Sequence, residues 1–353
     1  MKLWKKAVAA VTAGVLCVGS VGVTGLQGVL ESVGTVLSVS AYVPHSYDGT
    51  YGNLYYKEYS DSVSIVGCNE DVTSIEIPEE IDGKSVTSIE CEKDNYYDHG
   101  AFENCTNLTE ITIPDSVTSI GVSTFYGCTS LKNVYISDLE SWCKIELEYP
   151  YSNPLCNGAN LYVNGELATE ITIPDSVTSI GDCVFEGCTS LTKIIIPDNV
   201  TSIGCYSFTD CTNLNEITIP NGVTSIERGA FDNCTSLTEI TIPEGITSIE
   251  DGAFANCTSL TEITIPDNVT SIGSHAFDNC TSLTEVIILE GVTSIGDCAF
   301  DRCISLTEII IPNSVTSIED GAFQCCTNLK EITIPESCLL YTSPSPRDGL
   351  LSR

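Results

Sequence analysis

One line of sequence, close to ITIPDSVTSIG, recurs along most of this chain of 353 residues. It stands at residues 111–121 and, letter for letter, at 171–181. Near copies begin at Ile194, Ile217, Ile240, Ile263, Val286, Ile309 and Ile332. From Ile171 to Glu331 the copies form seven units of 23 residues with no insertion. A fixed short period of this kind is typical of a solenoid, in which each unit forms one coil and successive coils stack.

The apolar positions indicate how one coil is built. The unit reads I-x-I-P-x-x-V-T-S-I-x-x-x-A-F-x-x-C-T-S-L-T-E, with apolar residues at positions 1, 3, 7, 10, 15, 18 and 21. Positions 1 and 3 alternate as in a short strand, which ends at position 4 because proline has no N–H to donate. Phe, Cys and Leu at intervals of three favour a helical or 3₁₀ turn. Each coil is therefore predicted to contain a strand, a bend, a second extended segment and a tight turn.

Stacking such coils predicts a β-rich solenoid with a parallel sheet on one side and short helical or 3₁₀ turns on the other. No coil could bury its own apolar side chains alone, but in a stack each coil covers its neighbour at a spacing of about 4.8 Å. The phenylalanines at position 15 should then form one internal column: Phe185, Phe208, Phe231, Phe254, Phe277, Phe300 and Phe323. Positions 11–13 and 16–17 vary between units, so we expect their side chains to be exposed and free.

The line CTSLTEITIPDNVTSIG, with Phe three residues before the Cys, resembles the BspA-like (bacterial surface antigen A-like) leucine-rich repeat family of bacterial surface proteins. The resemblance covers residues 72–337. It implies a leucine-rich repeat solenoid in an exported protein that acts by adhesion or interaction, and it transfers no catalytic residues. Where broader leucine-rich repeats have Asn or Cys after the strand, this chain has Ser, Asn or Gly, so no asparagine ladder is expected at that place.

Departures from the repeat indicate the domain organisation. Residues 1–41 are predicted to be a signal peptide, because three lysines precede an apolar run and Val39-Ser40-Ala41 offers a cleavage pattern; an earlier cut or an uncleaved anchor are the alternatives. Residues 42–71 are expected to form a β cap over the first coil. The solenoid follows at 72–337, with irregular insertions at 91–100 and 134–170 and regular repeats at 171–331. Residues 338–353 abandon the repeat and resemble adapter read-through, with a natural tail as the alternative.

The charge limits the classes of partner. The chain has 48 acidic and 14 basic residues, a net charge of −34, which disfavours nucleic acid and bare anionic membranes. We expect no membrane insertion after signal removal and a monomeric protein. The partner left open is an extracellular protein or polymer, with basic proteins, divalent cations and neutral polymers all compatible with the charge.

Two candidate binding sites follow from the pattern. With positions 1 and 3 inward, positions 23 and 2 point outward and form one possible binding face, or simply a solvated sheet face: Glu216, Glu239, Glu262, Glu285, Glu308 and Glu331, beside Thr218, Thr241 and Thr264. The insertion 134–170 has an Asn164-Gly165 hairpin signal and several aromatics. Trp142, Tyr149 and Tyr151 are either a sugar-stacking platform or the plug of an irregular coil, and we favour the plug.

No residues support catalysis, a cofactor or a metal site. The chain has 19 cysteines, but most recur every 23 residues at an inward position, as a column of small buried side chains rather than a disulfide framework. Cys91 and His99 bracket a polar loop whose spacing matches no metal template. The first functional hypothesis is therefore a non-catalytic, exported or cell-surface binding protein. The second is a carbohydrate-binding or substrate-targeting component of an extracellular enzyme system.

Overall fold

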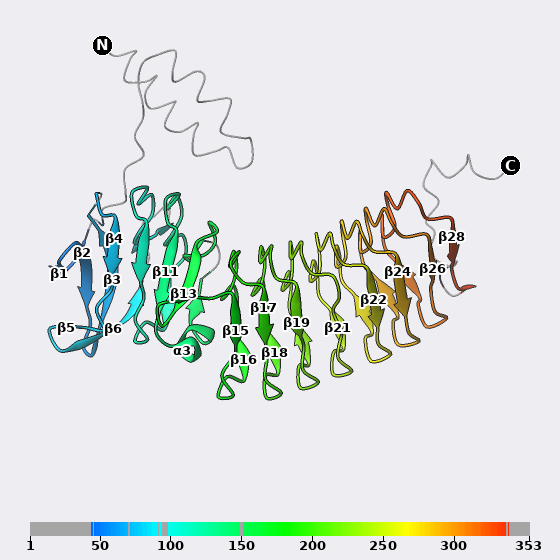
Figure 1. Ribbon diagram of the computed structural model, residues 1–353, viewed down its shortest axis with the longest axis horizontal. Coiled ribbons are helices and arrows are strands. Elements are labelled where there is room, and N and C mark those ends of the chain that lie inside the picture. The colour runs from blue at the N-terminus through cyan, green and yellow to red at the C-terminus, as the bar shows by residue number, and fades with distance from the viewer. Residues whose placement is uncertain are drawn as a thin grey trace, which may run out of the picture. The chain divides into compact units, whose positions relative to one another are not determined.

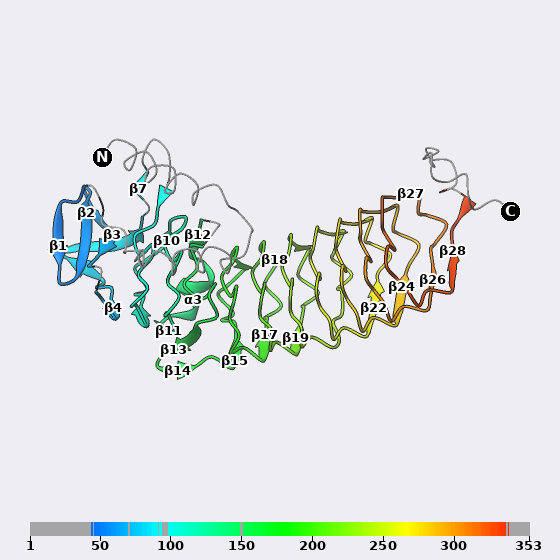
Figure 2. The ribbon, with the colours of Figure 1, turned by 90° about the horizontal axis from the view of Figure 1, so that it is seen from above.

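The computed structural model describes residues 44, 46–69, 71–90, 92–93, 98–148, 151–336 and 338. The predicted signal peptide and nearly all of the tail lie outside these residues. The described part is a β-solenoid whose strands follow one another along a single stack (Figure 1), and two rows of strands run along it (Figure 2). The prediction of a β-rich repeat solenoid with parallel strands is confirmed.

A small antiparallel meander precedes the first coil. Strands β1 (Gly49–Tyr51), β2 (Leu54–Glu58) and β3 (Ser62–Cys68) pair in sequence order, and β3 then pairs in parallel with β6 (Lys84–Ile89). The meander contributes buried side chains such as Val63 and Ile65 to the core of the solenoid. It covers the flank that a first coil would otherwise leave in water.

The strand at positions 23 to 3 of each coil forms what we call the first strand row. Its members are β4 (Ser74–Glu76), β9 (Glu110–Thr112), β11 (Asn133–Ile136), β13 (Asn160–Val163), β14 (Glu166–Leu167), β15 (Glu170–Thr172), β17 (Lys193–Ile195), β19 (Glu216–Thr218), β22 (Glu262–Ile265), β24 (Glu285–Ile288), β26 (Glu308–Ile310) and β28 (Glu331–Thr333). They form three sheets, β4 to β14, β15 to β19 and β22 to β28. Within each sheet neighbouring strands pair in parallel, mostly 23 residues apart, except that β14 closes an antiparallel hairpin with β13.

The predicted second extended segment is confirmed as a second strand row, formed by the Ser-Ile pair at positions 9 and 10. The turn between the rows is closed by the N–H at position 7, which donates to the carbonyl of proline at position 4, as from Val200 to Pro197 at 3.1 Å. The row comprises β6 with β5 (Glu80–Ile81) at its side, β10 (Ser119–Ile120), β12 (Glu146–Leu147), β16 (Ser179–Ile180), β18 (Ser202–Ile203), β20 (Ser225–Ile226), β21 (Ser248–Ile249), β23 (Ser271–Ile272), β25 (Ser294–Ile295) and β27 (Ser317–Ile318). A separate pair, β7 (Glu92–Lys93) and β8 (Asp98–His99), belongs to the first insertion.

The phenylalanine column is present in the core. Rings from Phe185 to Phe323 stack on one another with centroids 5.2–5.5 Å apart and interplanar angles of 1–9°. Six of the seven are fully buried, and Phe323 in the last coil is partly buried. The prediction of one internal column is therefore confirmed.

Threonine recurs because it completes the hydrogen bonding between coils. At position 8 the Thr270 Oγ1 donates to the carbonyl of Thr247 at 3.1 Å, and the Thr270 N–H donates to the same oxygen at 2.8 Å. Position 22 repeats this arrangement, as in Thr284 and Thr261. Two donors from one residue thus satisfy one carbonyl of the preceding coil.

The turn side departs from the predicted helical or 3₁₀ turn. Its N–H groups do bond three residues back, as from Cys234 to Phe231 at 3.3 Å. Positions 13 and 17, however, have left-handed backbone: φ is 62° at Gly229 and 58° at Asn233, for example. A residue with positive φ stops a right-handed helix, so each coil makes linked turns instead. Several variable side chains on this side are also buried, such as Cys183 at position 13 and Asp301 at position 16. This corrects the expectation that the variable side chains are exposed and free.

Both strand rows are interrupted between the coils that begin at Ile217 and Ile240. Within residues 151–336, all of which the structure describes, no strand forms at positions 23 to 3 after β19 until β22, and β20 does not pair with β21. The turn side stays continuous, because the N–H of Phe231 donates to Ala253 at 2.8 Å and the two phenylalanines stack at 5.4 Å. Among the described residues, the backbones of these two coils are thus hydrogen-bonded on the turn side only.

The insertion 134–170 forms the one described helix, α3 (Leu139–Cys143), and a hairpin. Asp138 caps the helix by accepting bonds from the N–H groups of Glu140 and Ser141. The predicted turn at Asn164-Gly165 joins β13 to β14, with φ of 52° and 81° as a type I′ turn requires.

Candidate binding surface

The first strand row presents the predicted column of acidic side chains to solvent. All six glutamates and the three threonines named above are exposed. The strand register sets Glu262 opposite Glu285 and Glu308 opposite Glu331. Glu216 is instead opposite Lys193 and forms an ion pair with it. Glu239 and Thr241 lie in the coil where the row is interrupted, so they extend the surface without a strand.

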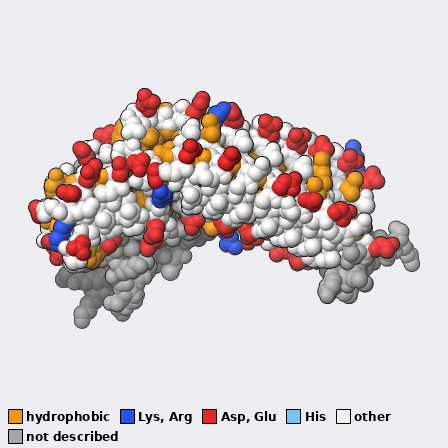
Figure 3. All heavy atoms as spheres, turned by 90° about the horizontal axis from the view of Figure 1, so that it is seen from below, with side chains coloured by type: hydrophobic (Ala, Val, Ile, Leu, Met, Phe, Trp, Pro, Cys, Tyr) orange, Lys and Arg blue, Asp and Glu red, His pale blue; other side chains and the backbone are white. Residues whose placement is uncertain are grey.

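The sequence interpretation missed an apolar component on the same face. At position 2, where other coils carry threonine, Ile195, Ile287 and Ile310 are exposed. Leu289 replaces the proline of position 4 and is exposed as well. An open groove of about 560 Å³ lies along β24 and β26 and includes Ile287, Leu289 and Ile310 in its lining. Figure 3 shows small groups of hydrophobic side chains on a surface whose charged side chains are mostly Asp and Glu. The signal was present in the sequence, as the replacement of Thr and Pro within otherwise regular units.

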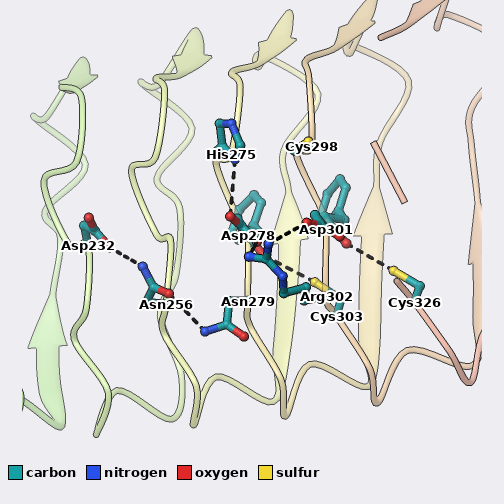
Figure 4. Close-up of polar contacts among 12 residues, drawn as sticks. Asp232, Asn256, His275, Asp278, Asn279, Cys298, Asp301, Arg302, Cys303 and Cys326 are labelled. Carbon is teal, nitrogen blue, oxygen red and sulfur yellow. Dashed lines mark hydrogen bonds and ion pairs between the residues drawn. The ribbon is translucent and has the colours of Figure 1, made fainter. Parts of the chain in front are cut away.

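The left-handed turn at position 17 supports a ladder of amide side chains (Figure 4). Asn279 Nδ2 donates to Asn256 Oδ1 at 3.0 Å, and Asn256 Nδ2 donates to Asp232 Oδ1 at 2.9 Å. At position 6, by contrast, Asn268 bonds only to the preceding coil's Glu244 and no continuous ladder forms there, as expected. Asn and Asp tolerate left-handed backbone better than most residues, which accounts for their recurrence at position 17.

Asp232 provides a test of this ladder. Its half-buried carboxyl has a pKa raised above the usual value, first by burial and then by Asp210 nearby, while the bond from Asn256 opposes the shift. A raised pKa in the folded state means that the ionised carboxylate destabilises the fold at neutral pH and that protonation relieves this. Asp232→Asn is therefore expected to raise the free energy of unfolding at pH 7 by about 0.5–1 kcal/mol.

This gain should shrink as the pH falls through the folded-state pKa, because the wild-type carboxyl then becomes neutral too. Urea unfolding followed by circular dichroism at pH 7 and pH 4 measures both values, with the exposed Asp267→Asn as the matched control. A gain of equal size at both pH values would contradict the assignment to this carboxyl.

The cysteines at position 18 are hydrogen-bond donors within the core. From Cys211 to Cys326 each Sγ lies near the phenylalanine carbonyl of the preceding coil, as Cys257 does to Phe231 at 3.3 Å. Figure 4 shows the same contact for Cys326, whose Sγ lies 3.1 Å from the carbonyl of Phe300. Cys188 instead lies 3.8 Å from Ser190 Oγ. Burial raises the pKa of the Cys280 thiol to about 12, so it stays protonated and is a poor nucleophile or metal ligand. The column is structural, as predicted, but its S–H donors were not foreseen.

The structure describes two of the three aromatic residues of the possible sugar-stacking platform, and of these Trp142 is buried. Trp142 is only 3% exposed, and its Nε1–H donates to the carbonyl of Val184 at 3.0 Å. The cavity beside it measures about 10 Å³, too small for a sugar. Tyr151 is exposed and packs edge-on against Tyr126, whereas Tyr149 lies outside the described residues. Trp142 thus belongs to the plug of the irregular coil.

A different aromatic pair lies on the first strand row. Tyr135 and Tyr162 are opposite each other on β11 and β13, and their rings stack with centroids 4.8 Å apart. Both are half-buried and occupy the outward position that threonine takes in regular coils.

No group of three or more His, Cys, Asp or Glu in the described part is arranged to hold a metal ion. His99 pairs with Glu103 at 3.1 Å and His275 with Asp278 at 3.3 Å. None of the described helices is long and apolar enough to cross a membrane.

Comparison with known proteins identifies relatives of the repeat. A family model described as the BspA type leucine-rich repeat region matches in six copies, over residues 64–146, 158–284 and 247–343, which is more than half of the chain. A leucine-rich cell surface protein from Faecalibacterium prausnitzii is 27% identical, with 85% of this chain and 90% of that chain covered and a TM-score of 0.45. A leucine-rich repeat protein from Bacteroides ovatus is 24% identical, with 82% and 89% covered and a TM-score of 0.45. No curated protein matches significantly.

Proposed function

Because the chain belongs to the BspA-type leucine-rich repeat family, we propose that it is an exported or cell-surface protein that acts by binding an extracellular protein or polymer, without catalysing a reaction. The observation that carries the proposal is the exposed first strand row. Its register repeats one set of outward side chains from coil to coil, which makes an extended surface rather than a single site. The lysines and apolar run at the N-terminus support export.

The charge of this surface favours basic or neutral partners. Paired glutamates such as Glu262 and Glu285 lie on neighbouring strands. In the regular coils, from β15 to β28, only Lys193 interrupts their column. Rim charges on such a face act mainly by steering the encounter, and salt screens them. Binding to a basic partner should therefore weaken as the ionic strength rises.

A panel binding experiment tests the proposal. The purified chain is passed over immobilised extracellular-matrix proteins, polysaccharides and bacterial cells, and saturable binding to at least one is expected. Glu262→Lys should weaken binding to a basic partner at least about threefold, because it reverses a charge on the face. Glu319→Lys is the control, since this exposed glutamate follows the second strand row. Absence of saturable binding across the panel, or equal losses in both variants, would contradict the proposal.

The polysaccharide arm addresses the second candidate, a carbohydrate-binding or substrate-targeting component. The observation in its favour is the Tyr135–Tyr162 pair on the first strand row, because aromatic rings contribute to sugar binding by stacking. Binding to a polysaccharide that Tyr135→Thr abolishes would favour this candidate.

A further inference from the structure

The groove along β24 and β26 is a local departure from a periodic surface. Neighbouring strands of the first row share several aligned residues: four between β22 and β24, and three between β26 and β28. Between β24 and β26 only Ile287 and Ile310 are aligned. The N–H of Lys330 donates to the carbonyl of Thr307 at 2.9 Å, but among the described residues the equivalent bond from the N–H of Thr307 to Thr284 is missing. The two strands are therefore parted beside the groove.

The groove exposes apolar side chains that the fold does not use. Ile287 is 43% exposed, Leu289 is 41% exposed and Ile310 is 71% exposed. Ile287 lies in β24 and Leu289 directly follows it, two residues further along, so both side chains point outward on the same side. Leu289 also supplies an N–H, absent from the usual proline, that donates to Ile265 at 3.0 Å and continues the strand pairing. Contiguous exposed apolar groups rimmed by polar residues are typical of interaction sites.

The groove is bordered by acidic residues. Glu285, Glu290 and Glu308 line it together with Thr284 and Thr307, and these five side chains are exposed. No Lys, Arg or aromatic residue is among its lining residues. An anionic partner is therefore disfavoured, and so is a sugar that needs a ring to stack on. A complementary partner must bring apolar groups to the floor and cations to the rim.

We propose that this groove binds an extended peptide segment of a partner protein in which apolar side chains alternate with lysine or arginine. In extended backbone, alternate side chains point to opposite sides and recur about every 6.6 Å, which lets apolar residues meet Ile287, Leu289 and Ile310. The intervening long cationic side chains reach the glutamates at the rim. The inference rests on the proposed function and names the chemistry of its partner.

A synthetic peptide tests this directly. The probe is a fluorescein-labelled octapeptide of alternating lysine and leucine, and its binding to the full chain is measured by fluorescence anisotropy. Saturable binding that weakens between 50 and 500 mM salt is expected. Two control peptides, one with glutamate for lysine and one with serine for leucine, should bind at least tenfold more weakly.

Two protein variants locate the site. Ile287→Thr combined with Ile310→Thr should weaken binding of the lysine–leucine peptide at least tenfold. Ile195→Thr is the matched control, since Ile195 holds the same position in another coil, is 48% exposed and does not line the groove. Threonine already occupies this position in β22 and β28, so the variants should fold, and thermal melting by circular dichroism verifies that they do.

The groove assignment is overturned if the octapeptide does not bind, if the control peptides bind equally well, or if Ile195→Thr loses as much affinity as the double variant. These results leave the proposed function standing when the chain still binds a member of the protein and polymer panel. If the chain binds neither the panel nor the octapeptide, both proposals fail.

Discussion

Phe254→Ala is expected to lower the free energy of unfolding by about 3–5 kcal/mol, because the ring is fully buried and its removal leaves a cavity. The ring stacks between Phe231 and Phe277 with centroids 5.4 Å away on each side. The coil backbones on both sides are hydrogen-bonded at the same level, so they have little freedom to collapse into the space. The loss should therefore fall in the upper part of the usual range. Urea unfolding followed by circular dichroism measures it.

Phe323→Ala is the matched control for that change. Phe323 ends the described column, stacks on Phe300 alone and is only partly buried. Its loss should be smaller by about 1–2 kcal/mol or more, since less apolar area is returned to water. Equal losses at the two positions would show that stacking within the column does not govern stability.

Trp142→Ala is expected to cost about 3–5 kcal/mol, because Trp142 anchors the irregular coil to the regular array. Its indole fills the space beside α3, and its N–H bonds to Val184 in the coil that begins at Ile171. The substitution removes the packing and leaves that carbonyl without its indole donor. Differential scanning calorimetry should record a lower melting temperature.

Tyr151→Ala separates the plug from a platform. Tyr151 is 46% exposed and its main aromatic contact is edge-on with Tyr126, worth about 0.5–1.5 kcal/mol. Its replacement should therefore shift the melting temperature much less than Trp142→Ala does. A Trp142 variant with unchanged stability and lost polysaccharide binding would reinstate the platform.

The sequence predicted what a fixed period determines. The positions whose side chains point inward or outward follow from the alternation of residues in a strand and from the stacking of coils. The phenylalanine column and the aligned glutamates could therefore be predicted from the sequence. The hairpin at Asn164-Gly165 could also be predicted, because its turn type needs residues that adopt positive φ. Each of these features depends on residues close in sequence or related by one repeat.

Other features depend on contacts that a pattern does not encode. From the sequence, cysteine at position 18 is interpreted as a small apolar residue. Its role as a hydrogen-bond donor is apparent only from the phenylalanine carbonyl of the preceding coil beside it. The residue type at position 17 varies, so the sequence does not reveal that the backbone there is left-handed in every coil. Gly187, Asn233 and Arg302 all adopt this conformation. The incomplete pairing of β24 with β26 depends on how two whole coils pack against each other, so no single substitution in the sequence predicts it.

The one-sided junction between the coils that begin at Ile217 and Ile240 affects how the stack loses structure. In a linear array of repeats each coil is stabilised only by its two neighbours. The number of coils that unfold together is therefore limited by the weakest interface between neighbouring coils. This junction keeps the stacked Phe231 and Phe254 but has no pairing in either strand row. We therefore expect the regular coils of residues 171–336 to behave as two cooperative blocks that share a boundary near residue 240, with the β24–β26 groove in the second block. That block could then unfold and refold while the first remains intact.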